Sequence, residues 1–85
     1  MRVLIIEDSR ELAGLIGDAL KRAGIDVDIV GLAEDARLAV QAVRYAAIVL
    51  DLGLPDASGL ALLDQLRRRR DSTPVLILSS RNALD

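Results

Sequence analysis

Carboxylates and hydroxyls follow three of the apolar runs in this 85-residue sequence. Glu7 and Asp8 follow the first run, Asp51 ends the third, and Ser79 and Ser80 follow the fourth. Three carboxylates held together raise each other's pKa, and a hard divalent cation such as Mg²⁺ relieves their repulsion. An aspartate beside Mg²⁺ can attack phosphorus to form an aspartyl phosphate, to which nearby hydroxyls can donate hydrogen bonds. These residue types therefore indicate phosphoryl chemistry, provided that the fold brings the three segments together.

Four short segments have the composition of β-strands. Three of them lack polar alternation, which is typical of strands buried on both faces. The remaining segment, the second along the chain, alternates apolar and acidic residues. This alternation predicts an edge strand with Asp26 and Asp28 in solvent. The buried strands are expected at 2–7, 46–51 and 74–79, and the edge strand at 25–30.

The segments between the strands repeat apolar residues at helical spacing. Ser9 and Ser58 are expected to cap the first and third helices, and Gly24 is expected to end the first. The order βαβαβαβ predicts a parallel α/β sheet whose carboxyl ends gather the acidic residues and serines at one edge. The residues expected to face the sheet are Leu12, Leu15, Ile16, Ala19, Leu20 and Ala23; Ala36, Ala39, Val40 and Val43; and Leu62, Leu63 and Leu66.

Composition excludes several functional classes. The sequence has no cysteine and no histidine, which excludes thiolate metal sites and Ser-His-Asp catalysis. The net charge of -2 argues against direct binding of nucleic acid, and no apolar run approaches the ~18 residues of a membrane span. We therefore expect a cytoplasmic domain that binds neither membrane nor nucleic acid.

Other polar residues are predicted to have structural roles. Asp56 is expected to be a turn residue beside Pro55, and Tyr45 a packing residue before the third strand. The four arginines at 67–70 are expected to form a solvated helix end, where cations suit the negative end of the helix dipole.

Three segments together resemble the receiver domain of two-component response regulators. They are residues 5–9 (IIEDS), 49–59 (VLDLGLPDASG) and 74–81 (PVLILSSR), and the second is most similar to OmpR/PhoB-type transcription regulators. The resemblance implies a flavodoxin-like (CheY-like) parallel sheet with strand order 2-1-3-4 and three helices. It also implies a signalling module rather than an enzyme, with transcription as the output of the full-length protein.

The resemblance implies a role for each residue of the acidic edge. Asp51 matches the phosphoacceptor that a sensor histidine kinase loads. Glu7, Asp8, Asp51 and the backbone carbonyl of Gly53 match the Mg²⁺ site, in which Glu7 holds a metal-bound water. Ser79 matches the hydroxyl that moves toward the phosphoryl group when the domain switches.

Two features depart from the family pattern. Receiver domains continue with a further helix, strand and helix, and their essential lysine lies on that strand, whereas the only lysine here is Lys21 in the first helix. We therefore expect residues 1–85 to be a partial receiver domain, truncated after the fourth strand. The apolar strand at 75–78 would then be an exposed edge, through which we expect self-association, for instance as a homodimer.

Two other functions stay open from the sequence alone. Without the lysine, the chain could be a non-phosphorylatable interaction or dimerisation module of receiver fold. A magnesium-dependent phosphohydrolase is a weaker alternative because no histidine can act as general base. Its Asp-x-Asp motif is also incomplete, since Gly53 stands two residues after Asp51.

Overall fold

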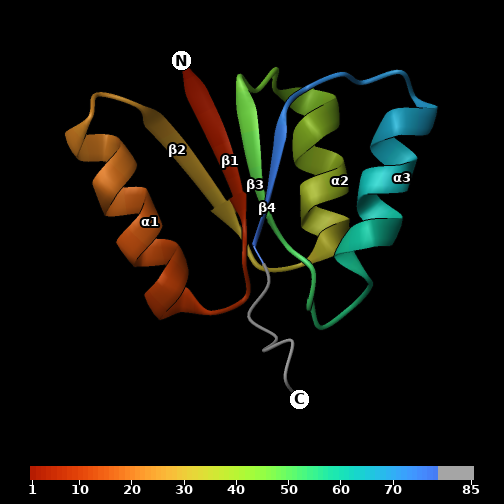
Figure 1. Cartoon of the computed structure of the whole chain (residues 1–85), viewed down its shortest axis with the longest axis horizontal. Helices are drawn as coiled ribbons and strands as arrows, with labels where there is room; N and C mark the ends of the chain where they lie inside the picture. The colour runs from red at the N-terminus through yellow and green to blue at the C-terminus, as the bar shows by residue number, and fades with distance from the viewer. Residues whose placement is uncertain (79–85) are drawn as a thin grey trace.

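Strands and helices alternate along residues 1–78, which are the residues that this computed structural model describes (Figure 1). The strands are β1 (Arg2–Ile6), β2 (Asp26–Val30), β3 (Ala47–Asp51) and β4 (Val75–Leu78). The helices are α1 (Arg10–Arg22), α2 (Ala33–Ala42) and α3 (Gly59–Arg68). Every strand and helix in this range matches an element that the sequence predicts.

The four strands form one parallel sheet in the order β2-β1-β3-β4, which confirms the predicted topology. β1 and β3 occupy the middle, and their side chains are almost entirely buried. Because all strands run the same way, their carboxyl ends share one edge of the sheet, the lower edge in Figure 1. We call this the carboxyl edge, and the opposite one the amino edge.

Helices cover both faces of the sheet (Figure 1). α1 packs on one face, and α2 and α3 pack together on the other, which produces two aliphatic cores. The core under α1 contains Val3, Ile5, Ala13 and Val49, and the core under α2 and α3 contains Leu4, Ile6, Ala36, Ile48, Leu50, Leu62 and Leu66.

The face of α1 that packs on the sheet is only partly the predicted one: Ile16 and Leu20 pack against the core as expected. Ala13 and Gly17 are its buried residues, whereas Leu12 is 36% and Leu15 64% exposed. A side chain at Gly17 would lie only 3.3 Å from the terminal carbon of Ile29, so the helix approaches the sheet through small residues. Counting large apolar residues at helical spacing missed this, because close approach depends on the smallest residues of a face.

The helix ends follow the predicted signals with one exception. The hydroxyls of Ser9 and Ser58 each accept a backbone N–H at 3.2 Å in the first turn of their helices. Gly24 ends α1 with a φ of 83°, a conformation that glycine adopts without strain. α2 is the exception, because its N-terminal flanking residue is Leu32, which has no side-chain acceptor.

Tyr45 and Asp28 form a hydrogen-bonded group near the amino edge. Tyr45 is only 6% exposed, which confirms its predicted packing role, and its hydroxyl donates to Asp28 at 2.7 Å. Burial raises the pKa of Tyr45 to about 12, and the hydrogen bond to Asp28 acts in the same direction. Arg2 donates to the other oxygen of Asp28 at 2.7 Å, so the prediction that Asp28 is merely solvated was wrong.

The arginine run is only partly a solvated helix end. The Arg67 guanidinium donates to the backbone carbonyls of Thr73 at 3.1 Å and Asp71 at 2.5 Å, and so holds the connection between α3 and β4. The Asp71 carboxylate accepts the hydroxyl and the backbone N–H of Thr73, and these bonds lower the pKa of Asp71. Arg68 pairs with Asp64 along the helix at 2.8 Å.

β4 carries exposed apolar side chains on both faces. Leu76 is 63% and Ile77 43% exposed, and within the described range no strand pairs with the outer side of β4. None of the helices in residues 1–78 has the length and apolar character that crossing a membrane requires.

Candidate metal centre

Three carboxylates meet at the carboxyl edge, as the sequence predicted. Ile6 pairs with Leu50 in the β1–β3 register, so Glu7, which follows β1, and Asp51, the last residue of β3, lie at the same level of neighbouring strands. Glu7, Asp8 and Asp51 each offer one oxygen, and these oxygens lie within 4.8 Å of one another. We call these three residues the acidic cluster.

The acidic cluster concentrates negative charge in a partly buried place. Glu7 and Asp51 are each 4% exposed, whereas Asp8 is exposed to solvent. Burial raises the pKa of Glu7, and the neighbouring Asp8 and Asp51 act in the same direction. The backbone N–H of Ser9, which donates to Glu7 at 2.9 Å, opposes this shift.

The donor set fits a hard divalent cation. All three side chains offer carboxylate oxygens, and the cluster contains no nitrogen or sulfur ligand. Mg²⁺ prefers oxygen ligands and retains several waters, for which the exposed side at Asp8 leaves room. A bound cation would also offset the repulsion that raises the pKa of Glu7.

The β3–α3 loop (residues 52–58) holds Asp51 from its C-terminal side. The backbone N–H of Gly53 donates to Asp51 Oδ1 at 3.3 Å, and Gly53 also forms an isolated bridge with Ser58. The N–H of Gly59 donates to the Leu52 carbonyl at 3.1 Å. A Cβ on Gly59 would lie 2.6 Å from the Asp51 carbonyl, so only glycine fits where α3 meets the end of β3.

Asp56 makes contacts that the sequence did not predict. Its two carboxylate oxygens accept the backbone N–H groups of Ala33 at 2.8 Å and Glu34 at 3.1 Å. These hydrogen bonds lower the pKa of Asp56. Asp56 therefore caps α2 from a different loop, and the missing acceptor at Leu32 was the signal that could have indicated such a cap.

Two further residues discussed from the sequence are Ser79, which the structure does not describe, and Lys21, which lies away from the acidic cluster. Ser79 lies outside the described residues, so its role as a switch hydroxyl stays a prediction; the preceding Leu78 pairs with Asp51. Lys21 lies in the last turn of α1, 12 residues beyond the cap Ser9, or roughly 18 Å along the helix. It therefore lies far from the acidic cluster.

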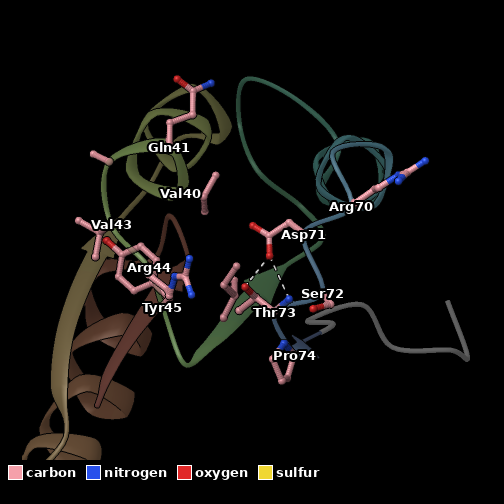
Figure 2. A pocket seen from close by; sticks show the side chains of 12 residues that line it. Val40, Gln41, Val43, Arg44, Tyr45, Arg70, Asp71, Ser72, Thr73 and Pro74 are labelled. Atoms are coloured by element: carbon pink, nitrogen blue, oxygen red, sulfur yellow. Dashed lines mark hydrogen bonds between the residues drawn. The ribbon is translucent and has the colours of Figure 1, made fainter.

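A second concave region lies near the amino edge and involves none of the acidic cluster. It has a volume of about 580 Å³ and lies between the end of α2 and the α3–β4 connection. Figure 2 shows Asp71 in this hollow, with its carboxylate bonded to Thr73. Tyr45 lines it too, and its hydroxyl is bonded to Asp28. The group of side chains able to hold a metal ion among the described residues is the acidic cluster, and the hollow contains none of its members, so the hollow is not the candidate metal centre.

A family comparison assigns the chain to a class. Residues 3–85 match the model of the response regulator receiver domain. The match spans nearly the whole chain, so this chain belongs to the response regulator receiver domain family.

Curated relatives are transcriptional regulators of OmpR/PhoB type. The chain is 40% identical over 85 residues to the transcriptional regulatory protein PmrA of Pectobacterium parmentieri, covering 100% of this chain and 38% of PmrA. It is 43% identical over 86 residues to TctD of Salmonella typhimurium, covering 99% of this chain and 38% of TctD. The chain therefore spans less than two-fifths of the length of these relatives.

Solved receiver domains share the fold. The receiver domain of the Francisella response regulator 1452 matches with a TM-score of 0.90 at 30% identity, over 96% of this chain and 68% of that one. A CheY-like receiver domain from Methylobacillus flagellatus matches with a TM-score of 0.86 at 34% identity, over 95% of this chain and 70% of that one. The TrrA response regulator of Thermotoga maritima, solved with Mg²⁺ and BeF, has the same fold at 22% identity and a TM-score of 0.88, covering 95% of this chain and 70% of TrrA.

Proposed function

We propose that this chain is a phosphoacceptor receiver module, phosphorylated on Asp51 by a sensor histidine kinase in the presence of Mg²⁺. The observation that carries the proposal is the meeting of Glu7, Asp8 and Asp51 within 4.8 Å at the carboxyl edge. Such a module is loaded and read by partner proteins, and it is not an enzyme that acts on an external substrate.

Glu7, Asp8, Asp51 and the Gly53 carbonyl are the groups that would hold Mg²⁺. When bound, the ion would neutralise charge on the phosphoryl oxygens as the group is transferred. Glu7 Oε2 accepts the backbone N–H of Ser9, and this bond fixes the carboxylate, which suits Glu7 to hold a metal-bound water in a fixed orientation. Asp8, the exposed member, lies where solvent and a phosphodonor can enter.

Asp51 is the nucleophile of the proposed transfer. One of its carboxylate oxygens forms a bond to phosphorus while the phosphorus–nitrogen bond of the kinase's phosphohistidine breaks. The electron pair stays on the imidazole nitrogen, and a proton from solvent restores the neutral ring. The hydrogen bond from Gly53 to Oδ1 orients the carboxylate for this attack.

The remaining parts of the proposal concern the whole protein. We propose that residues 1–85 are part of a cytoplasmic receiver domain that a further helix, strand and helix would extend. The chain covers 64–70% of the solved receiver chains reported to match it, which is consistent with that. Ser79 would respond to phosphorylation, and the output would be transcription, as the names of PmrA and TctD indicate for those proteins.

A second function, an interaction module of receiver fold, is favoured by two observations. Lys21 lies far from the acidic cluster, and Leu76 and Ile77 of β4 are exposed. We propose that the 85-residue chain self-associates through the outer edge of β4, which would hide these side chains. Self-association and phosphorylation are compatible, because β4 and the acidic cluster offer different surfaces.

Beryllofluoride with Mg²⁺ tests the site, since BeF₃ on an aspartate imitates the acyl phosphate. We expect addition of both to shift the backbone amide resonances of Leu52 and Gly53 in the chain. Asp51→Asn should abolish these shifts, while the matched control Asp64→Asn, an exposed aspartate on α3, should retain them. Identical spectra with and without the additives, in the chain and also in a longer protein that contains it, would refute the phosphoacceptor proposal and favour the interaction module.

A further inference from the structure

Three loops of the carboxyl edge lie against one another. The β1–α1 loop carries Asp8, and the β3–α3 loop follows Asp51. Between β2 and α2, a Cβ on Gly31 would lie 3.6 Å from the Asp8 Cα and 3.8 Å from the Glu7 carbonyl. The backbone N–H of Glu7 also donates to Val30 at 2.9 Å. The start of α2 is therefore placed directly against the segment that carries two of the three carboxylates.

Asp56 connects the β3–α3 loop to the β2–α2 connection, which itself lies against the β1–α1 loop. Its hydrogen bonds reach across 23 residues of sequence to Ala33 and across 22 to Glu34. Both carboxylate oxygens are used, and α2 has no side-chain cap of its own at Leu32. The bond is thus a helix cap supplied by the loop that follows the phosphoacceptor.

The other anchors of the β3–α3 loop hold it to β3, to α3, to the core and, through the backbone N–H of Leu52, to the Leu78 carbonyl of β4 at 3.4 Å. Leu54 is 9% exposed and belongs to the core under α2 and α3. Gly59 holds the loop's end against β3 by its close approach to Asp51. Among these anchors, Asp56 is the one that fixes the loop to the start of α2, and through it to Gly31 and Asp8.

We propose that Asp56 is a positioning residue of the acidic cluster, which fixes Asp51 and Gly53 relative to Asp8 by capping α2 across the loops. Its effect on Mg²⁺ rests on the proposed function, whereas its effect on the position of Gly53 does not. Groups that orient metal ligands influence affinity without touching the ion, because they set ligand geometry before binding. Loss of the cap would let the β3–α3 loop move away from Asp8.

Amide hydrogen exchange and Mg²⁺ binding by calorimetry, measured on the same variants of the chain, test this inference. In Asp56→Ala we expect faster exchange at Ala33, at Glu34 and also at Gly53, whose N–H reports on Asp51. We expect the Mg²⁺ dissociation constant to rise about tenfold. Asp56→Asn keeps one acceptor oxygen and should give intermediate values for both.

The matched control is Asp35→Ala. Asp35 lies in the same first turn of α2 and loses the same charge, but its carboxylate makes none of the hydrogen bonds seen within residues 1–78. It should leave the exchange of Gly53 and the Mg²⁺ affinity unchanged. If Asp56→Ala does not fold, Asp56→Asn decides by the same measurements.

Failure of the Asp56 inference and failure of the proposed function give different results. Faster exchange at Ala33 and Glu34 with unchanged Gly53 and unchanged Mg²⁺ affinity would overturn the inference and leave Asp56 a helix cap only. A wild-type chain that does not bind Mg²⁺ would refute the proposed function instead. In that case the exchange of Gly53 still decides whether Asp56 positions the loop.

Discussion

At the scale of one residue, Glu7 shows that the acidic cluster lowers the stability of the metal-free chain near neutral pH. It is a carboxylate that is 4% exposed and lies beside two others. Its folded-state pKa is raised above 4.5 mainly by burial, so the folded chain holds this proton more tightly than the unfolded chain does. The stability of the chain therefore falls as pH rises from 4.5 through the folded-state pKa of Glu7.

Glu7→Gln should stabilise the metal-free chain at neutral pH. We expect about 0.5–1 kcal/mol, the order of other single stabilising substitutions, because Gln keeps an acceptor for the Ser9 N–H and removes the charge. Urea unfolding measures the effect, and the gain should vanish well below pH 4.5. Glu11→Gln, in the exposed first turn of α1, is the control and should not stabilise. An equal gain at both pH values would contradict the assignment to Glu7.

At the scale of elements, side chains such as Asp56 and Arg67 fix the connections between strands and helices. The edge position of β2 and the helix caps at Ser9 and Ser58 were predictable from residue patterns, and the strand order from the resemblance to receiver domains. The prediction that β4 is buried on both faces was wrong, because β4 lies at the edge of the sheet within the described residues. The contacts of Asp56 and Arg67 were not predictable, because each joins segments whose proximity is known only after folding. The packing face of α1 was predicted only in part, with Ile16 and Leu20 correct, because Gly17 allows a close approach that a count of large residues does not reveal.

Gly59→Ala should destabilise the chain, because its Cβ would lie 2.6 Å from the Asp51 carbonyl. We expect a loss of about 1–3 kcal/mol, as for other overpacked sites. Gly14→Ala is the matched control: it lies within α1 with nothing inside 4 Å of the added carbon, and should stabilise by about 0.5–1 kcal/mol. Thermal or urea unfolding compares the two, and effects of the same sign would contradict this packing.

Asp71→Ala should weaken the α3–β4 connection at neutral pH. The two bonds from Thr73 lower the pKa of Asp71 below 3.8, so their contribution is present above that value and lost as pH falls through the folded-state pKa. We expect a loss of about 1 kcal/mol, measured by urea unfolding near pH 7. Asp64→Ala, which removes an exposed ion pair on α3, should cost less than about 0.5 kcal/mol. Equal losses would show that the Thr73 bonds contribute nothing.

At the scale of the whole molecule, the fold gathers the acidic cluster at the carboxyl edge of the sheet. It also leaves apolar side chains of β4 exposed. The sequence predicted both, because carboxylates end two buried strands and β4 is written without polar residues. The sequence does not indicate what covers β4. In the structure, residues 1–78 place no strand on its outer side.

Leu76→Lys should reduce self-association of the 85-residue chain. A lysine at an edge strand opposes pairing with another copy. Sedimentation velocity should show a smaller species than the wild type at the same concentration. Leu15→Lys on α1 is the matched control, because Leu15 is 64% exposed and Leu76 63%. A monomeric wild-type chain would refute self-association.

Phosphorylation of Asp51 by acetyl phosphate tests the central claim most directly. The chain is incubated with Mg²⁺ and acetyl phosphate, and its mass and the modified peptide are determined, with Asp51→Asn and a magnesium-free sample as controls. The account predicts one added phosphoryl group that maps to Asp51, requires Mg²⁺ and is absent from Asp51→Asn. An unmodified chain, together with an unmodified longer protein that contains it, would contradict the account.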